Sequence, residues 1–251
     1  MNVMPQNKET NSTATPATIK LGAELNFAAK EAYNLLRTNI VFSYPNSDGG
    51  KIIGVTSAAP SDGKTYTAIN LAYSFAEAGY NVLVIDADMR KPTVAQKLDK
   101  PLSPGLSNLL VSNEKNVVHK SVMHENLNVI TAGDIPPNPS ELLGSEKMEA
   151  VLKLFVEHFD YIFLDLPPAT VVADPLVVSK YLNGMVVVVA HKRTRQRDVI
   201  DTVRQLKMTG VRILGFVYND YSEGGKSYKR YSHYKGYYSH DSESLPSKKQ
   251  A

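Results

Sequence analysis

Cysteine is absent from the 251 residues of this chain. This absence excludes disulfides, thiolate nucleophiles, zinc fingers with cysteine ligands and iron–sulfur clusters. Long apolar runs are also missing. The first twenty residues lack an apolar segment of signal-peptide length, and the run Met185–Ala190 is far too short to span a bilayer. We therefore expect a cytoplasmic protein without a transmembrane segment, in which any membrane role comes through a partner.

Charge is unevenly distributed along the chain. From Tyr221 onward there are six Lys or Arg against three Asp or Glu, so this part alone carries +3, which equals the net charge of the whole chain. Basic residues interleaved with tyrosines can bind nucleic acid, but six are few, and the composition favours a solvated segment instead. The six histidines show no metal-binding spacing and are interpreted as surface or structural residues.

The hydrophobic pattern predicts an α/β fold. Six short runs rich in β-branched residues predict strands at 52–56, 82–86, 127–131, 161–165, 185–190 and 213–219. Helices are predicted at 25–42, 66–78, 148–158 and 197–207. The strands are apolar on both faces, which is typical of a mostly parallel sheet flanked by helices, in a three-layer α/β/α arrangement.

Three regions follow from this pattern. Residues 1–22 lack periodicity and are predicted to be a flexible N-terminal arm, residues 23–220 the folded domain, and residues 221–251 a disordered tail. The tail contains the stretch SYKRYSHYKGYY at 227–238, which has five tyrosines in twelve residues.

The first predicted strand is followed by AAPSDGKT at 58–65 and then by a helical pattern. This order fits a phosphate loop, in which backbone N–H groups at a helix N-terminus hold phosphates, Lys64 neutralises their charge and the Thr65 hydroxyl binds Mg²⁺. A chance strand–turn–helix corner is the alternative. The candidate nucleotide-binding residues are Ala59, Pro60, Ser61, Asp62, Gly63, Lys64, Thr65 and Tyr66.

Two further strands end in carboxylates. Asp86 and Asp88 lie in DADMRKP, where they could hold Mg²⁺ or accept a proton, although Asp-x-Asp alone is more often a solvated loop. Asp165 ends YIFLD in the manner of a Walker B strand, whose carboxylate reaches Mg²⁺; a helix N-cap is the alternative.

Together these motifs resemble the bacterial tyrosine kinases of capsule and exopolysaccharide assembly, a branch of the P-loop ATPases akin to MinD and ParA. The stretches GLSNLL at 105–110, AGDIPPNPSELL at 132–143 and EAYNLLRTNI at 31–40 are also similar to that family. The resemblance implies an ATP- and Mg²⁺-dependent protein-tyrosine kinase in which Lys64, Asp86 and Asp88 serve phosphoryl transfer, with Asp86 as the base.

The resemblance also assigns the metal site and the tail. It implies Mg²⁺ at Thr65, Asp86 and Asp165, an adenine contact or a plain turn residue at Asn219, and autophosphorylation of the tail tyrosines. The implied phosphoacceptors are Tyr228, Tyr231, Tyr234, Tyr237 and Tyr238.

Oligomers of the family form rings through an E-x-x-R-x-x-R helix. Here that pattern has Glu31 and Arg37, but Asn34 replaces an arginine. A second departure is Ser61, where the family commonly has glycine; serine adopts a positive φ less readily.

The implied partners are a membrane polysaccharide co-polymerase adaptor that activates the kinase and recruits it to the inner face of the plasma membrane, and a tyrosine phosphatase. No nucleic acid is expected. The alternatives are a MinD- or ParA-like switch ATPase without kinase activity, or a nucleotide-gated scaffold phosphorylated by another kinase.

Overall fold

The computed structural model describes residues 20–45 and 49–220. Its centre is a seven-stranded sheet in the order β3-β4-β2-β5-β1-β6-β7. All neighbouring strands are parallel except β3 and β4, which pair antiparallel. The strands are β1 (Lys51–Ser57), β2 (Val82–Asp86), β3 (Val118–His119), β4 (Leu127–Ile130), β5 (Tyr161–Asp165), β6 (Gly184–Ala190) and β7 (Ile213–Asn219).

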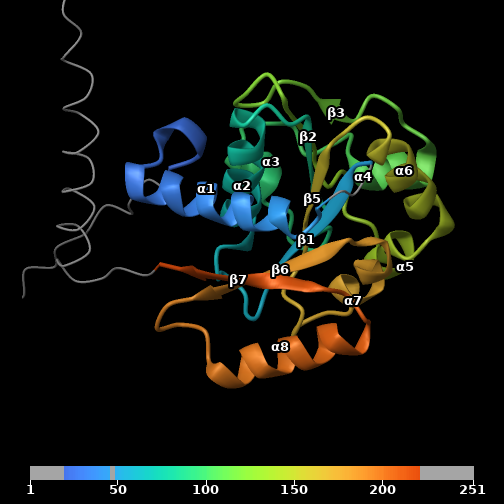
Figure 1. Cartoon of the computed structure of the whole chain (residues 1–251). Coiled ribbons are helices and arrows are strands. Elements are labelled where there is room, and N and C mark those ends of the chain that lie inside the picture. Colours follow the sequence, from blue (N-terminus) through green and yellow to red (C-terminus); the bar gives the residue numbers. More distant parts are fainter. Residues whose placement is uncertain (1–19, 46–48, 221–251) are drawn as a thin grey trace, which may run out of the picture.

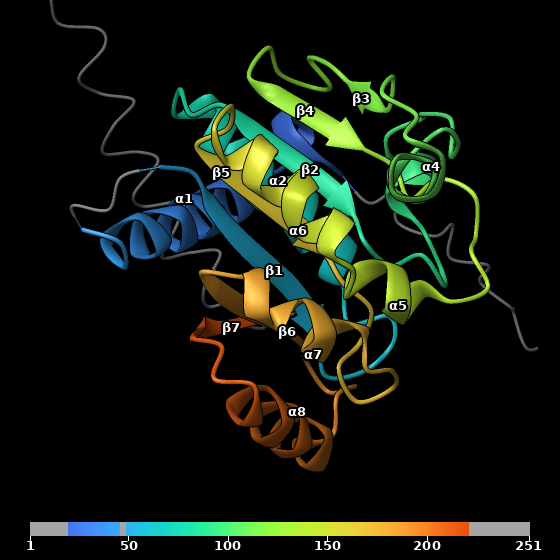
Figure 2. The same cartoon turned by 90° about the vertical axis from the view of Figure 1, so that its right-hand side faces the viewer.

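Helices cover both faces of this sheet, as Figures 1 and 2 show. One face packs against α1 (Phe27–Phe42), α2 (Lys64–Glu77) and α3 (Val94–Lys97). The other packs against α4 (Leu106–Ser112), α5 (Pro139–Leu143), α6 (Glu146–Val156), α7 (Asp174–Val178) and α8 (Gln196–Met208). Two 3₁₀ turns, Gly22–Glu24 and Ser179–Tyr181, complete the elements. The predicted three-layer α/β/α fold is confirmed.

The core forms because the central strands are apolar on both sides. Every residue of β1, β2 and β5 is buried, and the two faces contribute to two hydrophobic clusters that the sheet separates. The helix α2 lies directly on the sheet, and eleven of its residues are buried because α1 covers its outer side. This packing fixes the start of α2 against the end of β1, where the phosphate loop was predicted.

The edge strand β7 departs from the predicted pattern. Phe216 and Tyr218 are 51% and 54% exposed, so β7 is not buried on both faces. The reason is its place in the sheet, because β7 has β6 as a neighbour on one side and lies at the end of the strand order. The two-residue strand β3 and the short helices α3, α4, α5 and α7 were not predicted, since each is too short for a periodic signal.

The described residues just before the predicted start of the domain contact its core. Leu21 packs against the hydrophobic core, and the backbone N–H of Gly22 donates to the buried side-chain oxygen of Asn70 at 2.8 Å. Residues 21 and 22, which precede the predicted start of the domain at residue 23, therefore contact the domain. Residues 1–19 of the predicted arm and the whole predicted tail lie outside the described residues.

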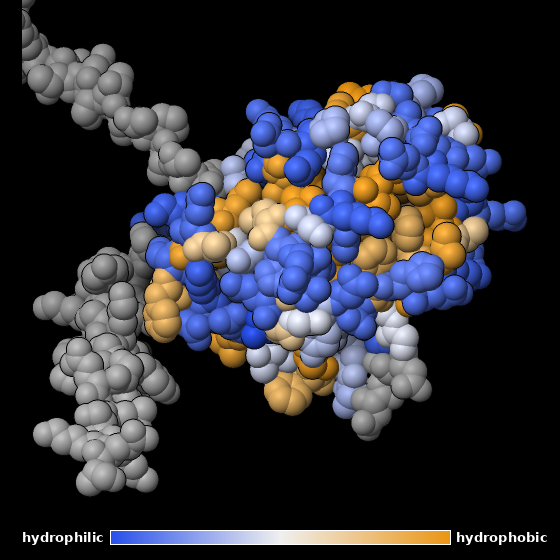
Figure 3. Space-filling view, turned by 90° about the horizontal axis from the view of Figure 1, so that it is seen from above, coloured by the Kyte–Doolittle hydropathy of each residue, from blue (hydrophilic) through white to orange (hydrophobic). Residues whose placement is uncertain are grey.

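The surface is mixed in character. In the space-filling view of Figure 3, hydrophobic residues form separate patches divided by hydrophilic ones. On α1, Leu35 and Phe42 are 63% and 76% exposed. In the described part of the chain, no helix combines the length and the apolar character needed to cross a bilayer.

Candidate active site

The chain turns sharply between β1 and α2 at the predicted phosphate loop. Gly63 has a left-handed backbone with φ 97°, and Lys64 begins α2 directly after it. A Cβ at Gly63 would collide with the side-chain amide of Asn219. Ser61 is left-handed as well, with φ 64°. Serine therefore stands at a position that favours glycine, and the conformation costs it ~1–2 kcal/mol.

A buried aspartate inside the loop holds the loop's shape. The carboxylate of Asp62 is inaccessible to solvent and accepts hydrogen bonds from the backbone N–H of Ala59 at 2.8 Å and from the Thr194 hydroxyl at 2.7 Å. The Asn219 amide donates to the Asp62 carbonyl at 2.9 Å. Asn219 ends β7, so its interpretation as a plain turn residue is wrong, and its contact with adenine stays a prediction.

The three predicted carboxylates lie together at the carboxyl ends of β2 and β5. Asp86 and Asp165 are register partners on these adjacent strands, and both are fully buried, while Asp88 is 3% exposed. The alternative of a solvated Asp-x-Asp loop is therefore wrong. The N-cap alternative for Asp165 is also wrong, because the next helix, α7, begins only at Asp174.

Lys64 joins two of these carboxylates. Its ammonium lies 2.9 Å from Asp88 Oδ2 and 3.3 Å from Asp165 Oδ1. The neighbouring Thr65 hydroxyl donates to Asp165 Oδ2 at 2.6 Å. Burial alone would lower the pKa of Lys64, but the negative charges of Asp165 and Asp88 outweigh it and raise this pKa above 10.5. Lys64 is therefore a fully charged ammonium at physiological pH.

Asp86 has a different environment. Its Oδ2 accepts the backbone N–H groups of Thr93 at 3.1 Å and Val94 at 3.0 Å, where α3 begins, and its Oδ1 accepts the N–H of Asp88 at 3.2 Å. Burial and the nearby charge of Asp165 raise the pKa of Asp86 to about 8, against the opposing effects of the Val94 N–H and the Lys64 ammonium. Three buried carboxylates beside one ammonium carry an excess of negative charge, which favours the protonated form of Asp86.

The loop after Asp88 is joined by hydrogen bonds and an ion pair to α5 and α7, which cover the face of the sheet opposite to α2. Arg90 makes a bidentate ion pair with the buried carboxylate of Asp174, at 2.8 and 3.1 Å, and donates to the Ser140 hydroxyl at 3.1 Å. Ser140 in turn donates to Asp174. The stretch 132–143 thus contributes Ser140 to a polar bridge between the DADMRKP loop, α5 and α7.

The family-like stretches 105–110 and 132–143 also contact each other. The N–H of Leu106 donates to the Thr131 carbonyl at 2.8 Å, and the Asn108 amide donates to Asp134 at 2.7 Å. The stretches 105–110 and 132–143 thus form one structural unit beside the acidic loop.

The residues of the predicted ring-forming pattern form a chain of contacts along α1. The Asn34 amide donates to Glu31 at 3.0 Å and its oxygen accepts from Arg37 at 3.0 Å. Arg37 also donates to the Ser74 carbonyl of α2. The three residues lie along one side of α1, and Arg37 also joins α1 to α2 within the chain. Their contact with another copy stays a prediction.

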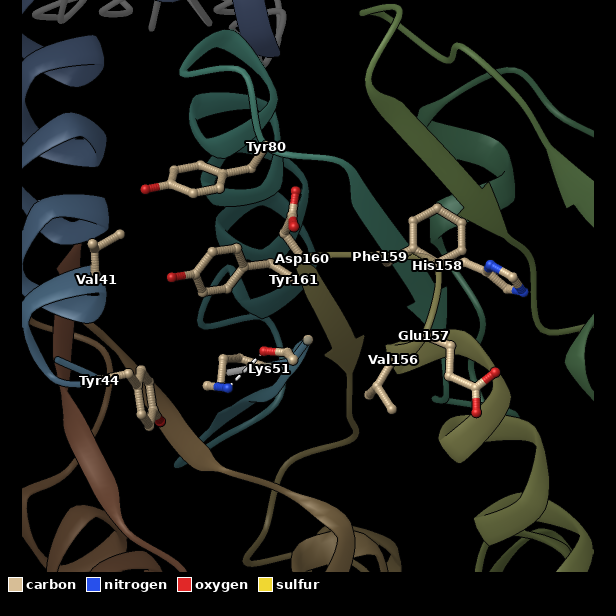
Figure 4. A pocket seen from close by; sticks show the side chains of 12 residues that line it. Val41, Tyr44, Lys51, Tyr80, Val156, Glu157, His158, Phe159, Asp160 and Tyr161 are labelled. Carbon is tan, nitrogen blue, oxygen red and sulfur yellow. Dashed lines mark hydrogen bonds between the residues drawn. The ribbon is translucent and has the colours of Figure 1, made fainter. Parts of the chain in front are cut away.

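A separate cavity of about 470 Å³ lies at the amino ends of β1 and β5, at the opposite end of these strands from the phosphate loop. Figure 4 shows the rings of Tyr44, Tyr80 and Tyr161 around it, together with Lys51 and Asp160. None of these residues belongs to the predicted site, so the cavity is unconnected with the chemistry of the phosphate loop.

The donors at the phosphate loop suit a magnesium ion. Within residues 20–45 and 49–220 no three His, Asp or Glu side chains form a complete metal cage. Mg²⁺ does not require one, because it usually takes one or two carboxylates together with substrate phosphates and water. The Thr65 hydroxyl and the Asp165 carboxylate, 2.6 Å apart at a loop shaped for phosphate, are oxygen ligands of the kind it prefers.

Some site residues were not predicted from the sequence. Thr93 follows DADMRKP directly, and its hydroxyl lies 3.0 Å from that of Thr65; its closeness to the motif was the available signal. Thr194 and Asp174 lie far along the chain from the residues they contact, so no local pattern marks them. The predicted phosphoacceptors Tyr228, Tyr231, Tyr234, Tyr237 and Tyr238 lie outside the described residues.

A parallel sheet with a glycine-containing loop, a buried lysine and carboxylates on adjacent strand ends defines a P-loop ATPase domain. The sequence model of the family described as "AAA domain" matches residues 50–208.

Known proteins narrow this class. The tyrosine-protein kinase CpsD of Streptococcus pneumoniae is 37% identical over 76% of this chain and 84% of its own length. The chimerical protein CapA2B2 has a structure with a TM-score of 0.73 and 35% identity over 77% of this chain and 85% of that one. The kinase domain of the Escherichia coli tyrosine kinase ETK gives 0.71 and 30% over 78% of each. The chain belongs to the bacterial tyrosine-protein kinases, and the resemblance inferred from its motifs is confirmed.

Proposed function

We propose that this protein-tyrosine kinase transfers the γ-phosphoryl group of Mg²⁺-ATP to the tyrosines of its own C-terminal segment and thereby regulates capsular or exopolysaccharide polymerisation and export. The main support is the position of Lys64. Its buried ammonium lies at the start of α2, between the carboxylates of Asp88 and Asp165, directly after a left-handed Gly63. This arrangement supports nucleotide binding, because phosphates are bound favourably at a helix N-terminus and a buried ammonium there would attract them.

Different residues at the loop would bind the phosphates, the Mg²⁺ and the adenine of the nucleotide. Backbone N–H groups from Ala59 to Tyr66 would bind the phosphates, and Lys64 would exchange part of its pairing with the two carboxylates for the β- and γ-phosphate oxygens. Thr65 and Asp165 would hold Mg²⁺, which neutralises phosphate charge when bound, with Asp86 as the more distant carboxylate. Asn219 lies beside the loop, where it would reach the adenine.

In the transfer, a bond forms between the tyrosine oxygen and the γ-phosphorus while the bond from this phosphorus to the β-bridging oxygen breaks. ADP leaves with that electron pair, and the tyrosine proton goes to a carboxylate, for which Asp86 is the candidate. With its pKa raised to about 8, Asp86 would accept the proton in its ionised minority form. Asp88 would orient Lys64 through their 2.9 Å contact.

We further propose that the transfer takes place in trans within an oligomer such as a ring. Its contact surface would be the side of α1 that carries Glu31 and Arg37. Leu35 and Phe42, both well exposed on α1, would add apolar area to it. An adaptor of the polysaccharide co-polymerase type would activate the kinase and recruit it from the cytoplasm to the inner membrane face, and a tyrosine phosphatase would reverse the modification.

The first test is tandem mass spectrometry of the purified chain after incubation with Mg²⁺-ATP and the cytoplasmic segment of its adaptor. We expect phosphotyrosine at 228–238 in the unaltered protein and in Lys153→Met, an exposed lysine on α6, and none in Lys64→Met. Tyrosines that stay unmodified while ATP is hydrolysed would contradict the kinase proposal and favour a switch ATPase. Phosphate on Lys64→Met would contradict the assigned site.

The second test separates trans from cis transfer. Lys64→Met with intact tyrosines is mixed with a chain that keeps Lys64 but has phenylalanine at all five candidate positions. Transfer between copies predicts phosphotyrosine on the Lys64→Met chain in the mixture only. If neither chain is labelled, although the unaltered protein is, transfer is confined to one copy.

A further inference from the structure

Thr93 lies between two of the proposed metal ligands, on an element that neither the motifs nor the proposed function includes. Its hydroxyl oxygen is 3.0 Å from the Thr65 hydroxyl oxygen, and its backbone N–H donates to Asp86 Oδ2 at 3.1 Å. A single residue therefore touches the side chain of one candidate ligand and, through its backbone, the side chain of another.

The direction of the hydroxyl contact follows from the hydrogens available. Thr65 has one hydroxyl hydrogen, which it donates to Asp165 Oδ2 at 2.6 Å. Thr93 must then donate its own hydrogen to Thr65 Oγ1. This occupies one lone pair of Thr65 Oγ1 and sets the direction of the other, which the Lys64 ammonium approaches at 3.3 Å. A cation at Thr65 would use that second lone pair once Lys64 turns toward phosphate.

The segment that carries Thr93 is fastened on both sides. Asp86 accepts the N–H groups of Thr93 and Val94 at the beginning of α3, and the Lys97 ammonium at the end of α3 lies 3.9 Å from the centre of the Tyr66 ring on α2. Because these contacts join α3 to both β2 and α2, the Thr93 hydroxyl has little freedom to move away from Thr65.

We propose that Thr93 is a positioning residue for Mg²⁺: its hydroxyl orients the Thr65 hydroxyl oxygen toward the metal and couples the metal site to Asp86 and α3. This rests on the proposed binding of Mg²⁺ and nucleotide at the phosphate loop. Because Thr93 contacts Thr65 and Asp86, both proposed metal ligands, we expect its loss to affect the contribution of the metal rather than the binding of nucleotide itself.

Calorimetric titration with ADP, in EDTA and in excess Mg²⁺, tests this coupling. Thr93→Val keeps the β-branched shape and removes the hydroxyl. We expect its ADP affinity in EDTA to equal that of the unaltered protein, and its affinity in Mg²⁺ to fall about threefold to tenfold, the effect of one lost hydrogen bond. Thr93→Ser keeps the hydroxyl and is expected to restore the response to Mg²⁺.

Thr202→Val is the matched control. Thr202 is a fully buried threonine on α8 whose hydroxyl donates to the Asp198 carbonyl, remote from the metal ligands in the sequence and on a different helix. Thr202→Val should leave the ADP affinity unchanged both in EDTA and in Mg²⁺. An undiminished Mg²⁺ response in Thr93→Val, or an equal loss with and without Mg²⁺, would overturn the role of Thr93 alone. If the unaltered protein binds ADP without any response to Mg²⁺, the proposed metal site falls together with it.

Discussion

Replacing Lys64 with methionine should change stability as well as activity. The side chain of Lys64 is 12% exposed, and its ammonium is shared between Asp88, 5% exposed, and Asp165, which is inaccessible. Removing one partner of a buried ion pair leaves unpaired charge and costs about 3–5 kcal/mol. We therefore expect the free energy of unfolding of nucleotide-free Lys64→Met at pH 8 to be about 3 kcal/mol lower than that of the unaltered protein.

The pH dependence of this loss follows from the groups that remain. The pKa of Lys64 is raised above its usual 10.5, so its contribution is complete below that pH and is lost only as the pH rises through the value in the folded protein. Between pH 5 and 8 the difference thus comes from the carboxylates. Burial raises the pKa of Asp165, and the loss of the Lys64 ammonium raises it further, so Asp165 can take up a proton in the variant as the pH falls and the deficit should shrink toward pH 5.

Urea unfolding of four proteins checks this reasoning. Lys64→Met combined with Asp165→Asn should recover part of the lost stability, because one of the two unpaired charges is gone, while remaining inactive. Lys153→Met, at a lysine whose side chain is 73% exposed, should stay within about 0.5 kcal/mol of the unaltered protein. A Lys64→Met protein as stable as the unaltered one at pH 8, or a deficit that grows toward acid, would refute the ion-pair account.

Two further results are expected from the strained loop and from the raised pKa of Asp86. Ser61→Gly should raise the free energy of unfolding by about 0.5–1 kcal/mol, since relief of the left-handed strain exceeds the added freedom of glycine in the unfolded chain. Urea unfolding measures this difference, with Ser61→Ala, which keeps the strain, as the control. A Ser61→Gly protein less stable than the unaltered one would contradict the left-handed conformation of Ser61. If Asp86 is the base, its pKa of about 8 predicts that the initial rate of tail phosphorylation rises roughly tenfold from pH 7 to pH 9 as the carboxylate ionises. A flat profile in the unaltered protein would remove Asp86 from that role.

The fold was largely predictable because its signals are local. Buried strands such as 82–86 and 161–165 have the same bounds in the structure as in the prediction, since each apolar run ends clearly at an aspartate. The helix 66–78 begins two residues earlier, at Lys64, because the phosphate loop leads directly into its first turn. The exposure of Phe216 and Tyr218 was not predictable, because the composition of β7 does not reveal that it lies at the edge of the sheet.

The candidate site was predictable in its components but not in its connections. Lys64, Asp88 and Asp165 stand in motifs whose order implies that they meet, and they do meet. The motifs do not show that Asp86 caps α3 rather than facing Lys64, nor that Ser140 and Arg90 share the buried Asp174. These contacts join residues from separate crossovers of the sheet, and their geometry depends on how the layers pack.

The sequence by itself determined the class of fold and the chemistry available at the phosphate loop, because strand and helix periodicity and the order of short motifs are local properties of the chain. Only the tertiary structure decided how that chemistry is distributed. Burial places three carboxylates beside a single ammonium and raises the pKa of Asp86 to about 8. The same packing brings Thr93 to Thr65 and Thr194 to Asp62, contacts that exist because parallel strands end at one edge of the sheet.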